Sequence, residues 1–113
     1  MREFARLARK IMIFIYVPCQ SVDEAKIIAR VLVQKKLAGR VDIMPTESVY
    51  QQKGGEVEEV SRATMIIMTI DKRIQDIEDT IKEQFQNRIP CVASITLYRL
   101  NREFKDWLIS STD

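Results

Sequence analysis

The sequence predicts an α+β fold in which helices pack on one four-stranded sheet, and three observations predict it. Segments 11–17 and 65–68 are apolar at every position, as is typical of central strands buried on both faces. Two segments with apolar residues at helical spacing follow those strands. A Gly-Gly turn at 53–56 joins two long strand patterns. The resulting order, βαββαβ plus a short C-terminal helix, predicts a ferredoxin-like domain with a long hairpin between its second and third strands.

The first strand, 11–17, is expected to stop at Pro18, and a helix is expected to follow. Ser21 and Glu24 have the spacing of a capping box, which marks the start of that helix. Lys35 and Lys36 would lie in its last turn, where cations suit the helix dipole, and Gly39 would end it. Its apolar face consists of Val22, Ala25, Ile28, Ala29 and Leu32.

The hairpin arms, 40–52 and 57–70, are each longer than the usual strand of about five or six residues. The first arm contains Pro45, which predicts a local break in the strand. Arms that overrun their own sheet expose backbone groups that commonly pair with a neighbouring chain. A solvated hairpin is the alternative.

A second helix follows, capped by Asp71 or Thr69 and ended by Pro90. The last strand is expected at 92–100, and Asn101 is expected to cap a final helix. The apolar stripe of the second helix is Ile74, Ile77 and Ile81 with Gln84 or Phe85, and that of the final helix is Phe104, Trp107 and Leu108.

Helices can cover only one face of such a sheet, yet its two central strands are apolar on both faces. Another subunit is the simplest cover for the second face. Oligomerisation therefore follows from the pattern, whereas the number of subunits does not.

Composition excludes several functions. The chain has 113 residues, enough for one domain, and a formal net charge of +2 with basic residues scattered among acids, which argues against nucleic-acid binding. Histidine is absent, so imidazole can serve neither as metal ligand nor as general base. No nucleophile–base pair is visible, and we expect no enzyme activity.

Residues 1–10 are predicted to be an N-terminal extension, and 11–113 a single domain. The arginines of residues 1–10 and the apolar segment 11–17 together imitate a short signal sequence, but no small-residue cleavage site follows. A buried strand is therefore the better interpretation of segment 11–17. No segment approaches the ~20 apolar residues needed to cross a membrane. Cys19 and Cys91 are far apart in sequence and are compatible with a reducing cytoplasm, although a single disulfide remains an alternative.

The segment LAGRVDIMPTESVYQQKGG, 37–55, resembles the CutA family of divalent-cation tolerance proteins. The resemblance continues through Ile89-Pro90 and the ending Asn101-x-Glu103-Phe104-x-x-Trp107-Leu108. It implies a compact homotrimer whose hairpins wrap across neighbouring subunits. The matching positions in 37–55 are Leu37, Ala38, Val41, Ile43, Pro45, Ser48, Tyr50 and a turn glycine.

The resemblance also implies a role in tolerance of divalent metals, with copper or another divalent cation as the ligand. This chain departs from the family's polar positions: Arg40 replaces Cys, Gln52 replaces Trp, Arg62 replaces an acid, Met68 replaces Lys and Cys91 replaces an acid. Arginine adds positive charge and cannot become a ligand. Cys91 and Cys19 are the remaining candidate metal ligands, and buried packing is the alternative for both.

Arg40, Arg62 and Arg88 replace family positions that the resemblance places around an intersubunit cleft, where Tyr50 is also expected. Converging arginines would favour a carboxylate or phosphate over a metal. The leading hypothesis is thus a trimeric tolerance protein. The alternative is a PII-like regulator that binds a small anion or a partner protein at this cleft.

Overall fold

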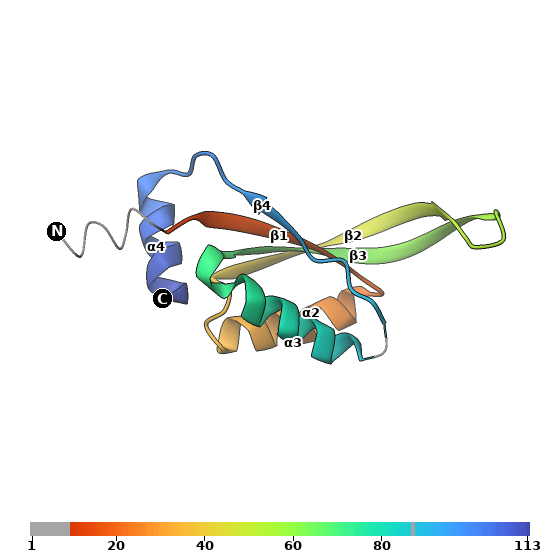
Figure 1. The fold of residues 1–113 in the computed structure, drawn as a ribbon, viewed down its shortest axis with the longest axis horizontal. Coiled ribbons are helices and arrows are strands. Elements are labelled where there is room, and N and C mark those ends of the chain that lie inside the picture. Colours follow the sequence, from red (N-terminus) through yellow and green to blue (C-terminus); the bar gives the residue numbers. More distant parts are fainter. Residues whose placement is uncertain (1–9, 87) are drawn as a thin grey trace.

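The computed structural model describes residues 10–86 and 88–113, so the predicted extension lies, apart from Lys10, outside the described residues. Figure 1 shows one antiparallel sheet with two long helices along one face. The strand order β2-β3-β1-β4 is that of the ferredoxin-like fold, as predicted. The strands are β1 (Met12–Cys19), β2 (Arg40–Gln51), β3 (Val57–Ile70) and β4 (Ala93–Thr96). The helices are α2 (Val22–Gln34), η1 (Asp71–Arg73, a 3₁₀ turn), α3 (Ile74–Phe85) and α4 (Arg102–Thr112).

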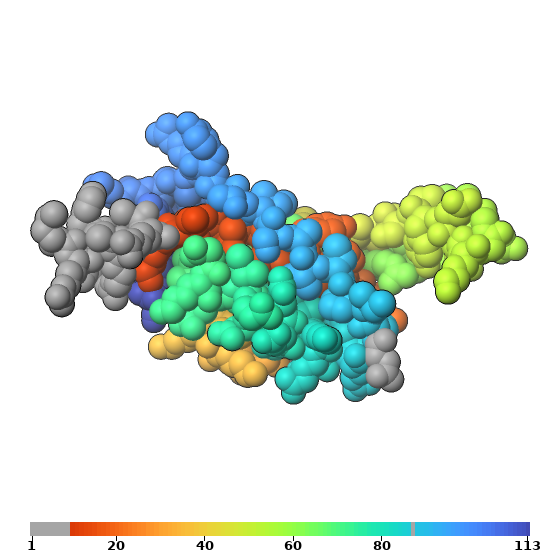
Figure 2. All heavy atoms as spheres, viewed as in Figure 1, coloured from red at the N-terminus to blue at the C-terminus, as the bar shows by residue number. Residues whose placement is uncertain are grey.

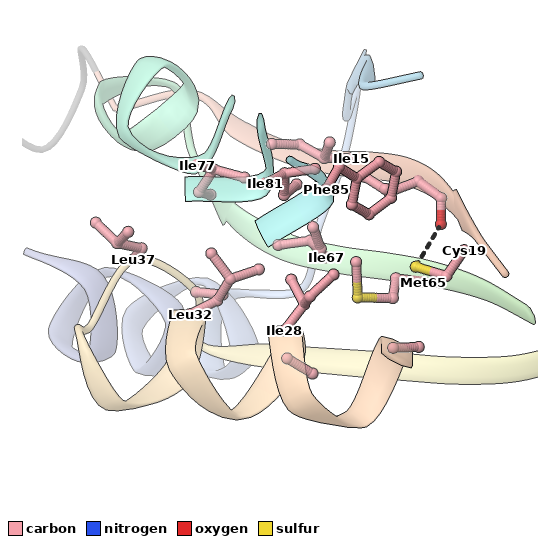
Figure 3. Close-up of a cluster of buried hydrophobic side chains, with 14 of the residues drawn as sticks. Ile15, Cys19, Ile28, Leu32, Leu37, Met65, Ile67, Ile77, Ile81 and Phe85 are labelled. Atoms are coloured by element: carbon pink, nitrogen blue, oxygen red, sulfur yellow. Dashed lines mark hydrogen bonds between the residues drawn. The ribbon is translucent and has the colours of Figure 1, made fainter. Parts of the chain in front are cut away.

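The main core lies between the sheet and helices α2 and α3 (Figure 3). Ile15 and Ile67 from the central strands meet Leu32 of α2 and Ile81 of α3, and all four are fully buried. Burying each such side chain contributes about 1.5–3 kcal/mol. Phe85, not Gln84, completes the stripe of α3, because Gln84 is exposed.

A smaller cluster lies on the opposite face of the sheet, under α4. Leu108 and Ile109 pack with Met12, Met68 and Ile70, whose register places them on the face away from α2 and α3. Asn101 occupies the position before α4, but its side chain donates to Glu103 and does not cap the helix. Trp107, expected on the packed stripe, is 43% exposed, while Ile109 is buried.

Pro18 does not end β1, contrary to the prediction, and instead pairs with Thr64 of β3. Leu97 donates to the Met12 carbonyl, so even-numbered residues of β1 direct their backbone polar groups toward β4. The pairing with β4 ends at Tyr16. The missing N–H of Pro18 therefore costs no hydrogen bond of the sheet. Pro45 likewise stays within β2, which is an edge strand.

The start of α2 is as predicted, but its end is not. Ser21 accepts a hydrogen bond from the Glu24 N–H, while the Glu24 carboxylate accepts from Gln20 N–H. At the other end, Lys36 takes the left-handed conformation with φ of 59°. Its N–H donates to Val33 O, and Leu37 N–H donates to Leu32 O, which is a Schellman motif. Lys36 therefore occupies the position predicted for Gly39.

Two other boundaries differ from the prediction. Neither Thr69 nor Asp71 caps α3, because the buried Thr69 hydroxyl donates to Leu37 O at 2.6 Å and the Asp71 carboxylate accepts from Lys72 N–H. β4 ends at Thr96, whereas 92–100 was expected, since residues after Leu97 pass the start of β1 and have no strand opposite them.

The hairpin overruns the sheet. β1 ends at Cys19 opposite Ala63, so the β3 residues from Val57 to Arg62 pair only with β2. This overhang projects from the body and gives the molecule extents of 58 × 26 × 20 Å (Figure 2). Val49 and Val57 near its tip are more than 60% exposed. A two-stranded ribbon of this kind is marginally stable without further contacts.

We predict that Lys36→Gly stabilises the protein by about 1 kcal/mol, because glycine adopts positive φ without the steric penalty of a Cβ. Lys35 is the matched control, since its φ is −81°. Lys35→Gly should destabilise by about 0.5–1 kcal/mol. Denaturant unfolding at one fixed protein concentration measures both changes. Equal destabilisation by the two variants would contradict the assigned role of Lys36.

Candidate functional site

A hollow with polar lining lies where the overhanging hairpin leaves the sheet, and we name it the hairpin-base hollow. Its volume is about 500 Å³. Three parts of the chain form it: the end of β1, the hairpin arms, and the segment from the end of α3 toward β4. The lining residues are Tyr16, Pro18, Cys19, Gln20, Ser48, Tyr50, Arg62, Phe85, Arg88, Ile89 and Cys91.

The hairpin contributes Arg62 and Tyr50, which touch each other. The Arg62 guanidinium lies 5.6 Å from the centre of the Tyr50 ring and donates to its hydroxyl at 3.3 Å. Tyr50 in turn donates to the Glu58 carboxylate at 3.2 Å. Both side chains leave the sheet on the face away from α2 and α3, because even-numbered residues of β2 and β3 share that face.

Arg88 reaches the hollow from the segment after α3. Its guanidinium forms a bidentate ion pair with Glu24 at the start of α2 and lies 4.3 Å from the Phe85 ring centre. Burial acts to raise the pKa of the Glu24 carboxyl, but the bonds from Arg88 and from Gln20 N–H outweigh it and lower the pKa overall. The pair thereby ties the segment after α3 to the start of α2.

Both cysteines line the hollow, and both are free thiols. Cys91 is exposed, whereas Cys19 is buried and directs its Sγ toward Val17 O at 3.8 Å (Figure 3). Burial, together with the neighbouring negative charge of Glu24, raises the pKa of the Cys19 thiol to about 11, although Arg88 acts against this. Cys19 is therefore protonated at neutral pH, which disfavours metal binding because a proton must leave first.

Arg40 does not line this hollow. Its guanidinium pairs with Asp42 at 3.2 Å and lies 5.4 Å from the Phe104 ring centre, near α4. Within one chain the hollow brings together Arg62, Arg88, Tyr50 and the two cysteines, and leaves Arg40 out. The sequence analysis did not single out Tyr16, Gln20 or Phe85 for this site, although the alternation along β1 could have placed Tyr16 on the open face.

The donor set fits a hard divalent cation poorly. No group of three or more Cys, Asp or Glu side chains in residues 10–86 and 88–113 has the geometry to hold a metal ion. Two guanidiniums in the hollow also oppose a cation. The two thiols are soft donors and would suit copper(I) better than a hard ion.

The fold and this hollow define a ferredoxin-like α+β protein with a thiol- and arginine-lined recess at the base of a protruding hairpin. The chain belongs to the CutA1 divalent ion tolerance protein family, whose model matches residues 13–111. The divalent-cation tolerance protein CutA of Archaeoglobus fulgidus is 34% identical over 95 residues, which are 84% of this chain and 92% of that protein. The CutA of Thermus thermophilus is 29% identical over 102 residues, covering 89% of this chain and 96% of the relative.

Solved structures of CutA proteins have the same fold as this chain. The periplasmic divalent cation tolerance protein CutA from Archaeoglobus fulgidus superposes with a TM-score of 0.85 at 31% identity, over 90% of this chain and 99% of that one. CutA1 from Oryza sativa gives 0.85 at 27% identity, over 91% and 94% of the two chains. Among the helices in the described part of the chain, none is long and apolar enough to cross a membrane.

We predict that the two thiols differ strongly in reactivity. At pH 8 a pKa of about 11 leaves Cys19 with roughly a hundredth of the thiolate of an unperturbed cysteine. In the folded protein one thiol, Cys91, should react rapidly with an aromatic disulfide reagent, and Cys19 only slowly. The Cys19→Ser variant should retain the fast phase and Cys91→Ser should lose it. Two equal fast phases would show that Cys19 is accessible.

Proposed function

We propose that this protein acts in tolerance of divalent cations as a non-catalytic protein. The observation that carries the proposal is the match to the CutA1 family over residues 13–111, at 34% identity to a relative with that name.

If the protein binds a metal directly, Cys91 and Cys19 are the ligands that the geometry supports best. They are the only thiols of the chain, and both line the same hollow. Cys91 would bind first because it is exposed, and Cys19 would follow with loss of its proton. The four methionines of the described strands, Met12, Met44, Met65 and Met68, are less suitable as a group because Met12, Met65 and Met68 are buried core residues.

Copper(I) titration under reducing conditions tests this assignment. If the two thiols hold copper(I), one equivalent should bind the wild type, and Cys91→Ser should weaken binding by at least tenfold because two-coordinate copper loses half of its donors. Met44→Leu, a change at an exposed methionine outside the hollow, should bind as the wild type. Unchanged binding by Cys91→Ser would exclude the thiol site.

The tolerance role itself is tested separately in cells. Expression of the wild type in a copper-sensitive bacterial strain that lacks its own protein of this family should restore growth on copper. Growth that stays unrestored, with the protein folded and abundant, would refute the proposal.

We also propose a homotrimer, as the family resemblance implies. The support is the face of the sheet away from α2 and α3, which α4 covers only at the end near Met12. Met44 and Ile95 on the rest of that face are 44% and 54% exposed. Apolar side chains along one sheet face are expected to be covered in solution.

Light scattering coupled to gel filtration should therefore give about three times the mass of one chain. Ile95→Glu should dissociate the assembly, because it places a carboxylate against the covered face. Ile27→Glu is the matched control: Ile27 is 61% exposed but lies on α2, outside that face. A monomeric wild type, or dissociation by Ile27→Glu alone, would contradict the assigned interface.

A further inference from the structure

We propose that the hairpin-base hollow binds a small organic anion, a carboxylate or phosphate carried on a planar apolar group. This inference goes beyond the proposed tolerance function and requires no metal. The hairpin-base hollow has a volume of about 500 Å³, which is within the usual range of about 300–1,000 Å³ for small-molecule sites.

The charge of the lining is the first argument. Two arginines line the hollow, and none of its eleven lining residues is Asp or Glu. Arg62 contacts the ring and the hydroxyl of Tyr50, and in the described part of the chain no carboxylate forms an ion pair with it. A guanidinium has five N–H donors in a planar fork, so Arg62 retains donors for a bidentate anion.

The apolar part of the lining is the second argument. The exposed rings of Tyr16 and Tyr50 line the hollow, and so does Ile89, which is 96% exposed. Phe85 also lines it but is a buried core residue. Ser48 and Gln20 add neutral polar groups. A few polar anchors among aromatic surfaces are typical of sites for small organic molecules, and a bare inorganic ion would leave the rings unused.

Arg88 is the second positively charged side chain of the hollow, but it already forms an ion pair with Glu24. The bidentate Glu24–Arg88 pair neutralises that guanidinium from the α2 side. A ligand anion must therefore compete with Glu24 for Arg88, while Arg62 meets it without such a competitor. This arrangement predicts opposite effects for two substitutions: loss of Arg62 weakens binding, and neutralisation of Glu24 strengthens it.

The test is calorimetric titration of the metal-free, assembled protein with benzoate, phenyl phosphate and the neutral analogue benzamide. We expect saturable binding of benzoate or phenyl phosphate, weakened by added salt, and at least tenfold weaker binding of benzamide. The stronger of the two anions identifies the carboxylate or the phosphate as the preferred group.

Three variants locate the site. Arg62→Gln should weaken anion binding about tenfold or more, because a charge-assisted bidentate contact is lost. Glu24→Gln should tighten it severalfold by freeing Arg88. Arg40→Gln should leave it unchanged, since Arg40 is an arginine of the same strand pair that pairs with Asp42 outside the hollow.

Absence of saturable binding of both anions overturns the proposal, as does equal binding of benzamide. Equal losses in Arg62→Gln and Arg40→Gln would assign the effect to overall charge and also overturn it. If Arg62→Gln fails to fold, the sign of the Glu24→Gln effect decides, because weaker binding in that variant contradicts the competition. The anion titration is run without metal and the copper titration without the anions, so failure of the copper site and failure of this proposal are distinguishable.

Discussion

The unequal length of neighbouring strands is the constraint on which the rest of this structure depends. β1 stops at Cys19, opposite Ala63, while β2 and β3 continue as a pair to Gln51 and Val57. A step in the sheet edge results, and the chain that returns from α3 toward β4 passes beside it. Beyond Ala63 the hairpin has no β1 residue beside it, and the hollow that contains both thiols and two arginines lies at this step.

The two faces of the sheet are covered unequally. α2 and α3 cover the face of Ile15 and Ile67, and this core is complete within one chain. The opposite face has only α4, which lies over Met12 and Met68 at the end far from the overhang. The helix-covered face therefore stabilises the single chain, and the opposite face is the one available for association between chains. A substitution on one face can change assembly while the helix-covered core stays intact.

Sequence patterns predicted the fold well because the fold depends on periodicity and turns. The bounds of β3 and the cap at Ser21 followed from apolar runs and local hydrogen-bonding chemistry. Lys36 and Pro18 could not be predicted in the same way. The left-handed position usually takes glycine, but the hydrogen bonds around Leu32 and Leu37 hold Lys36 there. Whether Pro18 ends the strand depends on where β4 stops, and the tertiary structure decides that position.

The candidate site was predictable by residue type but not by place. Arg40 and Arg62 share a face of the hairpin, yet Arg62 lies opposite Thr46, six residues along β2 from Arg40. At about 3.3 Å per residue this is a separation of roughly 20 Å. The Gly-Gly turn already implies that register, so strand pairing read from the turn would have separated the two arginines. Arg88 could be assigned only from the structure, because its position depends on the contact with Glu24.

Glu24 links the chemistry of the thiols to that of the arginines. Its carboxylate accepts from Gln20 N–H at the start of α2, pairs with Arg88, and helps to raise the pKa of Cys19. A metal cation could bind Cys19 only after the thiol had lost its proton. The two guanidiniums of the hollow would also repel that cation. An anion meets the Arg62 guanidinium directly and requires no loss of the Cys19 proton. The electrostatics of the hollow in the single chain therefore favour an anion over a cation, and metal tolerance by this protein need not proceed through a metal bound at this place.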